Sequence, residues 1–313
     1  MKNQNKIEEM IHNMEQIIVG KREVIEFTLV TLLAGGHLLL EDVPGVGKTT
    51  LAKTIAQTIH CGFTRIQFTP DTLPSDVTGL SIYNMQSGRF EYSKGAIVNN
   101  IILADEINRT SPKTQASLLE AMEEKQVTVD GVTYPIPRPF MVIATQNPVD
   151  YLGTYNLPEA QLDRFMMKLS IGYPQLGEEQ LMADRFLNRQ LTQALAPVVE
   201  GETVLEMQKE VEEVKVSQDL INYITRLVAE TRKDSNITLG ASPRATLALL
   251  RASQARAYLM GRDYVIPDDI IGLIQPVIAH RIILAPEARL SQTKSDKILK
   301  NVMAKVPVPV LAK

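Results

Sequence analysis

The apolar residues of the first half of the chain fall in short, continuous runs. Four segments are predicted to be strands, three of them such buried runs and one a further strand candidate at residues 65–68: residues 37–40, 65–68, 101–104 and 141–144. Helix-compatible segments separate them, including residues 24–33 before the first run and residues 48–59 after it. Wholly apolar strands that alternate with helices are typical of a parallel sheet covered on both faces. The first half is therefore predicted to be a layered α/β domain.

The second half has helical patterns instead. One face of a predicted helix carries four apolar residues, Leu220, Ile224, Leu227 and Val228. Ser242 followed by Pro243 indicates an N-cap and the first turn of a helix that continues to residue 257. Another helix is predicted to begin at residues 267–269, where two acidic residues suit the helix dipole. Strand-like alternation is absent after about residue 172, so we predict a smaller all-helical domain.

The change of pattern also suggests where the domains meet. Residues 1–190 are predicted to form the α/β domain, and residues 216–313 the helical one. Residues 191–215 are the predicted linker, with a helix of its own near residues 206–214.

Composition favours a soluble, cytoplasmic protein. The 313 residues are 44% hydrophobic and 22% charged, and the formal net charge is −3, which argues against coating nucleic acid by bulk charge. A single cysteine, Cys61, excludes an internal disulfide. The polar N-terminus lacks the apolar core of a signal peptide. No stretch approaches the roughly 20 apolar residues that span a bilayer. The four histidines are scattered, and none is predicted to bind a metal.

The residues after the first predicted strand indicate a phosphate-binding loop. The usual pattern, G-x-x-x-x-G-K-[ST], lies between a strand and a helix. Gly47, Lys48 and Thr49 match it, whereas Asp42 occupies the position of the first glycine. Phosphate is held by backbone N–H groups and by the positive end of the following helix, so Gly45 and Gly47 can keep the loop open for a ligand. The alternative is a tight turn with a solvated lysine.

In the predicted ATP complex, Lys48 reaches the β- and γ-phosphates and the Thr49 hydroxyl binds Mg²⁺. The other predicted nucleotide-binding residues of this segment are Pro44, Val46 and Thr50.

Two carboxylates follow the third predicted strand. Adjacent acids at the carboxyl end of a buried strand are costly unless they bind something, and ligands of open α/β sheets sit at such ends. Asp105 is predicted to hold Mg²⁺ through water, and Glu106 to polarise the attacking water as general base. A solvated strand end with helix-capping acids is the alternative. Asn147, after the fourth predicted strand, is suited to orient that water, although Asn147 before Pro148 is also a turn signal.

Five blocks of the sequence resemble the MoxR family of AAA+ ATPases. They are residues 41–49, 104–109, 144–148, 157–165 and 240–244, and they occur in the family's order. The resemblance implies an AAA+ P-loop core, with a parallel sheet flanked by helices, and a smaller all-helical lid domain. Lys48 with Thr49 resembles the Walker A pair, and Asp105 with Glu106 resembles the Walker B pair. Aspartate at position 42, in place of the usual glycine, resembles a variant that the family tolerates.

The resemblance implies roles for residues that composition could not single out. Asn147 resembles the polar sensor that faces the γ-phosphate. Arg164 resembles the arginine finger that reaches a neighbouring subunit's nucleotide, and Arg244 resembles the second sensor on the lid. Val19 and Gly20 match a segment that packs near adenine. A surface salt bridge of Arg164 with the adjacent aspartate at position 163, and a solvated Arg244, are the alternatives.

Two inserts also resemble those of the MoxR subgroup. One spans residues 76–97 and contains a turn at residues 86–89. The other is a predicted hairpin at residues 126–134, where Asp-Gly at positions 130 and 131 is a strong two-residue turn signal. Such protrusions are expected to contact a partner or line a ring pore, unless they are merely decorative. Arg109 is a further candidate for a contact near a subunit interface.

Together these resemblances imply an ATP hydrolase that cycles between ATP and ADP with Mg²⁺. Its sites are expected between the subunits of a homo-oligomeric ring, a hexamer. The implied role is chaperone-like, acting on a protein client that carries a von Willebrand factor A domain. A nucleic-acid motor is the main alternative, but the sequence after Ile298 is too short for an appended DNA-binding domain. A chelatase motor subunit and a nucleotide-dependent scaffold are further alternatives.

Overall fold

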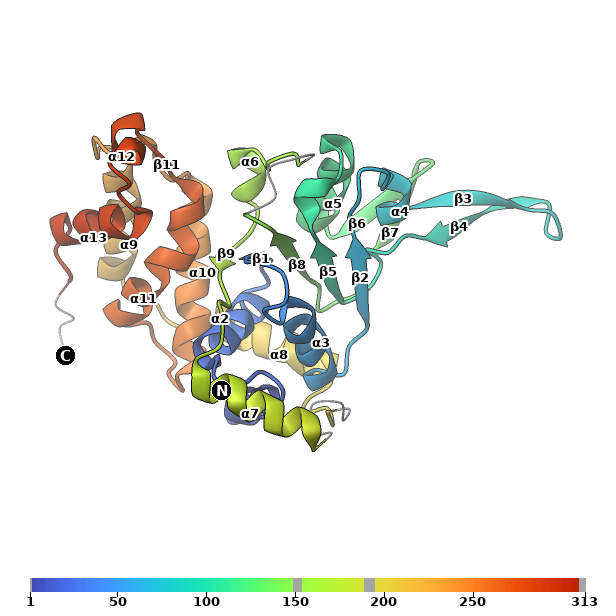
Figure 1. Cartoon of the computed structure of the whole chain (residues 1–313), viewed down its shortest axis with the longest axis horizontal. Coiled ribbons are helices and arrows are strands. Elements are labelled where there is room, and N and C mark those ends of the chain that lie inside the picture. The colour runs from blue at the N-terminus through green and yellow to red at the C-terminus, as the bar shows by residue number, and fades with distance from the viewer. Residues whose placement is uncertain (1, 149–153, 189–194, 310–313) are drawn as a thin grey trace.

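Five parallel strands form the central sheet, in the order β2–β5–β8–β1–β9. The computed structural model describes residues 2–148, 154–188 and 195–309 (Figure 1). The strands are β1 (Leu38–Glu41), β2 (Phe63–Gln67), β5 (Ile101–Asp105), β8 (Met141–Gln146) and β9 (Met167–Leu169). The four predicted strands are confirmed. The fifth, β9, was not predicted, because three residues that include a lysine carry no readable pattern.

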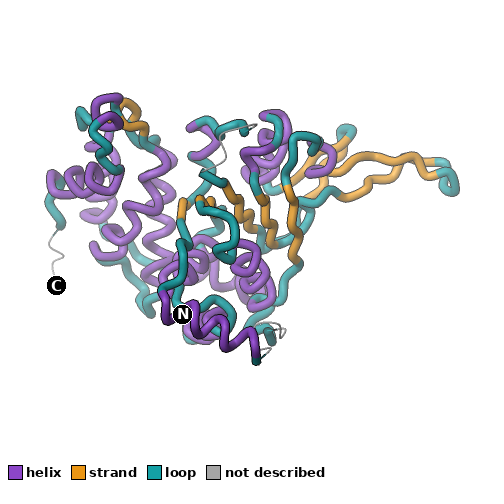
Figure 2. Tube along the Cα trace, viewed as in Figure 1, coloured by secondary structure: helices purple, strands orange, loops and turns teal. Residues whose placement is uncertain are grey.

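The continuous apolar runs bury both faces of the sheet. Leu38 and Leu40 of β1 belong to one hydrophobic cluster, whereas Leu39 between them belongs to the other. The first cluster includes side chains of α1 (Lys6–Glu15), α2 (Arg22–Leu33) and α3 (Lys48–Thr58). The second includes side chains of α5 (Pro112–Glu124). Because successive strand residues point to opposite faces, this alternation confirms the layered α/β arrangement (Figure 2).

Two antiparallel hairpins project from this domain at the predicted inserts. After the short helix α4 (Pro74–Thr78), strands β3 (Gly79–Asn84) and β4 (Arg89–Lys94) form a long arm that extends away from the rest of the chain (Figure 1). Strands β6 (Gln126–Val129) and β7 (Val132–Pro135) form the second hairpin. Asp130 and Gly131 have φ values of 49° and 78°, as a two-residue turn of the predicted kind requires.

The second half is mostly helical, and its helices from α9 onward gather at one end of the molecule (Figure 1). Its helices are α6 (Glu159–Leu162), α7 (Leu176–Leu187), α8 (Gly201–Glu212), α9 (Gln218–Thr231), α10 (Pro243–Leu259), α11 (Pro267–Ile278), α12 (Pro286–Leu290) and α13 (Ser295–Lys305). The predicted apolar face of α9 is buried, and the Ser242 hydroxyl accepts the Arg244 N–H at 3.1 Å as an N-cap. One short antiparallel pair, β10 (Ile237–Leu239) with β11 (Ile283–Leu284), adds strand structure that the sequence pattern did not reveal.

The helix expected within the predicted linker is α8. Its buried residues Val204, Met207 and Val211 join the same hydrophobic cluster as α2 and α10. Residues 191–194, where the predicted linker begins, lie outside the described residues.

None of the helices in the described ranges is both long and apolar enough to cross a membrane.

A buried histidine joins three elements at the start of β1. His37 Nε2 donates to the carbonyl of Met122 at 3.2 Å, and Nδ1 accepts the N–H of Val142 at 3.0 Å. Only the neutral ring can accept at one nitrogen and donate from the other. Burial is the main cause that lowers the pKa of His37 to about 4.

This histidine should make stability fall in mild acid. Between pH 6.5 and 4 the unfolded chain binds a proton at His37 that the folded chain excludes, so the stabilisation is present above pH 6.5 and lost as the pH falls. From pH 7.5 to 5.0, His37→Asn should lose about 2 kcal/mol less unfolding free energy than the wild type. Urea titrations measure this difference. Exposed His12 offers the control, because His12→Asn should keep the wild-type slope. Equal slopes for wild type and His37→Asn would contradict the assignment.

Candidate functional site

The loop between β1 and α3 has the geometry of a phosphate cradle. Gly45 and Gly47 have φ values of 88° and 98°, in the left-handed region that favours glycine. A Cβ atom at either glycine would meet no other atom within 4 Å, so the loop is open to a ligand on that side. Gly47 is also the N-cap residue of α3, which begins at Lys48. The free N–H groups of the first helical turn and the helix dipole both favour an anion at this place.

Asp42 explains how the loop departs from the usual pattern. Its buried carboxylate accepts hydrogen bonds from the Ser170 hydroxyl at 2.7 Å and from the N–H groups of Ile171 at 2.6 Å and Gly172 at 3.1 Å. Its carbonyl accepts from Lys48 Nζ at 2.8 Å. The side chain thus fastens the loop to the segment after β9, while its backbone holds the lysine.

The two acids lie at the carboxyl end of β5. Asp105 is buried and accepts from the Thr145 hydroxyl at 2.7 Å and from Arg65 Nη2 at 2.6 Å. Glu106 has a left-handed φ of 57°, and its carboxylate accepts from Gln67 Nε2 at 3.0 Å. Residues other than glycine rarely adopt that conformation, and it strains their backbone. The side chains of three neighbouring strands, β2, β5 and β8, therefore meet here.

Sheet order brings the loop and the acids to the same edge. Strand β8 lies between β1 and β5, so the ends of β1 and β5 are two strand spacings, or about 10 Å, apart. Asn147 follows β8 directly and is buried. The structure thus places five predicted site residues around the carboxyl end of the sheet: Lys48, Thr49, Asp105, Glu106 and Asn147. These donors and acceptors fit a site for a nucleoside triphosphate and a cation.

Three contributing residues escaped the sequence analysis. Arg65 and Gln67 stand on the edge strand β2, and Thr145 stands within the apolar run of β8. The local signal was a polar residue at the end of, or within, a short strand, which is common and does not single out a site. Arg109, predicted near an interface, forms an ion pair with Glu106 at 3.2 Å.

The two predicted arginines lie elsewhere. Arg164 Nη2 is 3.2 Å from Glu123 Oε2, and Arg244 binds the other oxygen of the same carboxylate. Both arginines line a cavity of about 230 Å³ together with residues 35–37. These residues lead into the amino end of β1, whereas the phosphate loop leaves its carboxyl end. Four residues of strand separate the two edges by about 13 Å.

A buried network holds both arginines in place. Asp163 accepts from Arg281 Nε at 2.7 Å and from the Ser242 hydroxyl at 2.7 Å. The alternative of a salt bridge between Asp163 and Arg164 is therefore wrong. Asp163 instead joins the segment before Arg164 to the cap before Arg244. Burial lowers the pKa of Arg281, and the bond to Asp163 opposes that shift.

The segment expected near adenine is covered by α7. Val19 is buried, and Gly20 has a φ of 72°. Glu178 of α7 lies so close to Gly20 that a Cβ atom there would be 2.0 Å from its carboxylate oxygen. Lys21 donates to the carbonyl of Tyr173 at 2.8 Å, which ties the same segment to the start of α7.

Comparison with known proteins agrees with this geometry. Residues 37–167 match the ATPase family associated with various cellular activities (AAA), and residues 229–302 match the AAA lid domain. The chain is 40% identical over 312 residues to Chaperone MoxR1 of Mycobacterium tuberculosis, covering 97% of this chain and 82% of that protein. The chain belongs to the MoxR family of AAA+ ATPases.

Three further proteins are similar to the chain over most of its length. Protein MoxR of Methylorubrum extorquens is 30% identical over 318 residues, covering 93% of this chain and 92% of that protein. The uncharacterized protein YeaC of Bacillus subtilis is 50% identical over 300 residues, covering 96% of this chain and 94% of that protein. A crystal structure of a candidate ATPase from Cytophaga hutchinsonii superposes with a TM-score of 0.93 at 42% identity, covering 99% of this chain and 96% of that chain. The resemblance to MoxR, the AAA+ core and the helical lid are thus confirmed.

Restoring the usual glycine should weaken this MoxR-family fold. Asp42→Gly removes three hydrogen bonds to a buried carboxylate and leaves the N–H of Ile171 without its acceptor. We expect a loss of about 3 kcal/mol in unfolding free energy. Chemical denaturation measures it. Asp71→Gly is the control, because Asp71 is exposed and its side chain makes no hydrogen bond within the described ranges. Equal stability of the two variants would contradict the anchoring role of Asp42.

Proposed function

We propose that the chain hydrolyses ATP between the subunits of a ring and uses the energy to remodel a protein client. One observation carries this proposal. The phosphate loop, the acids and Asn147 share one edge of the sheet, whereas Arg164 and Arg244 share Glu123 at the other edge. Each protomer therefore presents half of a site on either side. Joining such halves head to tail closes a ring, for which we expect six copies.

In the nucleotide-binding half, each residue has a definite task. Lys48 exchanges the carbonyl of Asp42 for the β- and γ-phosphates, and the backbone around Gly45 and Gly47 cradles them. The remaining contacts come from Pro44, Val46 and Thr50, and adenine packs near Val19 and Gly20. This half orients the γ-phosphate toward the adjoining protomer.

Thr49 and Asp105 are the residues that would hold Mg²⁺, which neutralises phosphate charge when bound. Asp105 is held by Arg65 at 2.6 Å, so the guanidinium and the cation compete for one carboxylate. Glu106 takes the proton of the attacking water, and Asn147 orients that water. The bond from Gln67 to Glu106 holds the base away from the water until nucleotide arrives.

The other half supplies positive charge to the adjoining protomer. Arg164 is the proposed finger and Arg244 the proposed sensor, and both must exchange Glu123 for a γ-phosphate. An arginine supplied by a neighbouring subunit stabilises the transition state of phosphoryl transfer and can raise kcat by orders of magnitude.

The long hairpin supports a protein client rather than nucleic acid. Its strands expose Ile82, Tyr83 and Phe90, and Met85 at the turn is 91% exposed. An apolar arm of this kind suits contact with another protein. We propose a chaperone-like role in the cytoplasm, on a partner with a von Willebrand factor A domain.

Glu106→Gln should bind ATP but not turn it over. The amide keeps the shape of the side chain and cannot accept the proton of the water, so we expect kcat to fall at least about 100-fold with an ATP Kd within about threefold of wild type. Phosphate release and nucleotide titration measure the two quantities. Glu120→Gln, at an exposed position of α5, is the matched control. Normal turnover by Glu106→Gln would refute the role of the base.

Mixing variants tests whether the arginines act between subunits. Glu106→Gln and Arg164→Ala should each be inactive alone, but about a quarter of the interfaces in an equal mixture should be complete. Arg164→Ala mixed with Arg244→Ala should stay inactive, because no interface then holds both arginines. Arg226→Ala is the control, because Arg226 is exposed and its loss should leave turnover unchanged.

The second mixture distinguishes two arrangements. Recovery there would mean that Arg244 serves the nucleotide of its own protomer, contrary to the proposal. Full activity of isolated protomers would refute the ring mechanism itself.

A further inference from the structure

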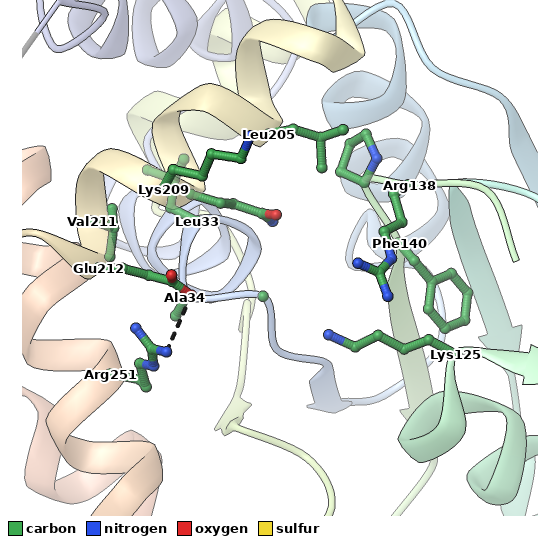
Figure 3. A pocket seen from close by; sticks show the side chains of 13 residues that line it. Leu33, Ala34, Lys125, Arg138, Phe140, Leu205, Lys209, Val211, Glu212 and Arg251 are labelled. Carbon is green, nitrogen blue, oxygen red and sulfur yellow. Dashed lines mark hydrogen bonds and ion pairs between the residues drawn. The ribbon is translucent and has the colours of Figure 1, made fainter.

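A cavity of about 560 Å³ lies where the amino edge of the sheet meets α8 and α10 (Figure 3). Four cationic residues line it, two from the α/β domain and two from the helices: Lys125, Arg138, Lys209 and Arg251. Its one acidic residue, Glu212, is paired with Arg251 at 3.1 Å. The cavity therefore has a net positive lining.

Lys125 and Arg138 extend into the same open space (Figure 3). Within the described ranges neither side chain forms a hydrogen bond or an ion pair, and the carboxylate that acts on Lys125 electrostatically is Glu212, which is paired with Arg251. Lys125 is half-buried and has a left-handed φ of 54° at the end of α5. Burial and, to a smaller extent, the charge of Arg138 lower the pKa of Lys125, whereas the charge of Glu212 opposes that shift. Lys125 is the partly buried one of the two and Arg138 is exposed, so the cost of the like charges falls on Lys125, and a bound anion would reduce it.

The shape of the cavity says more about the ligand. Its volume lies within the roughly 300–1,000 Å³ of small-molecule sites, well above what a single phosphate needs. Leu33, Leu205 and Pro139 supply apolar walls. Exposed Lys209 reaches in from α8, so cations stand on both sides of the opening (Figure 3). A guanidinium binds phosphate through paired N–H groups, and a lysine binds it as a point charge.

We propose that this cavity binds a small molecule with two or more linked phosphates, through Lys125, Arg138 and Lys209. The site is separate from the phosphate loop, because Gly35 on its lining precedes β1 and the loop follows β1. The ligand joins the α/β domain to α8 and so clamps the two together.

The cavity also adjoins the arginine pair. Gly35 and Lys125 line both this cavity and the smaller one that contains Glu123, Arg164 and Arg244. Glu123 and Lys125 are two residues apart at the end of α5. A phosphate ligand that draws Lys125 toward it acts on the same helix end that holds the arginines.

Titration calorimetry with pyrophosphate tests the proposal on the full chain. The phosphate loop would also bind pyrophosphate, so the parent for all variants is Lys48→Ala, which disables the loop. We expect one pyrophosphate per chain. Lys125→Ala with Arg138→Ala should weaken the pyrophosphate Kd at least about tenfold, since the paired N–H contacts of the guanidinium and the charge of the lysine are both lost. Lys209→Ala alone should weaken it several-fold. The control is Lys297→Ala with Lys300→Ala, which removes two charges from an exposed lysine cluster and should change nothing.

Further ligands separate the possible sources of the anion. Inorganic phosphate should bind more weakly than pyrophosphate, and ADP at least as tightly if the apolar walls receive an organic group. Citrate binding as tightly as pyrophosphate would overturn the assignment to phosphates. So would absence of pyrophosphate binding in the parent, or binding that survives the paired substitution. If circular dichroism shows that the variant with both Lys125→Ala and Arg138→Ala is unfolded, Lys209→Ala is the deciding variant. An unchanged pyrophosphate Kd in Lys209→Ala then refutes the site.

Discussion

The buried ion pair between Asp163 and Arg281 sets how the lid meets the α/β domain. The Arg281 side chain is 2% exposed, and it also donates to the carbonyls of Phe165 at 2.7 Å and Met166 at 3.0 Å. Removing one partner of such a pair leaves an uncompensated buried charge, at a cost of about 3–5 kcal/mol. Ser242 binds the same aspartate. One carboxylate thus determines where both arginine-bearing segments lie.

Sheet order imposes the complementary constraint. Placing β8 between β1 and β5 brings the phosphate loop and the acids within reach of one ligand. The same parallel arrangement puts the residues before β1 at the far edge, beside Arg164 and Arg244. The phosphate loop and the two arginines therefore lie toward opposite ends of the parallel strands. The proposed division of the site between protomers rests on this separation.

Several cations and acids of the candidate site form hydrogen bonds or ion pairs within the chain. Lys48 is held by a carbonyl, Asp105 by Arg65, and Glu123 holds both arginines. The proposed nucleotide binding would exchange these partners, at a small cost in free energy because each exchange replaces one polar contact with another. Lys125 and Arg138 differ, because their side chains form no hydrogen bond or ion pair among the described residues. That contrast is what distinguishes the cationic cavity from the proposed catalytic machinery.

The sequence by itself determined the features that depend on local pattern. Four strands, the loop at Lys48 and the acids at 105 and 106 were readable, because burial periodicity, glycine placement and strand ends are properties of neighbouring residues. The resemblance to MoxR added the roles of Arg164 and Arg244, but not their location. Only the tertiary structure decided that β9 completes the sheet, that Arg65 and Thr145 bind Asp105, and that Asp163 pairs with a residue 118 positions away. Such contacts depend on which elements pack together, and no local pattern records that choice.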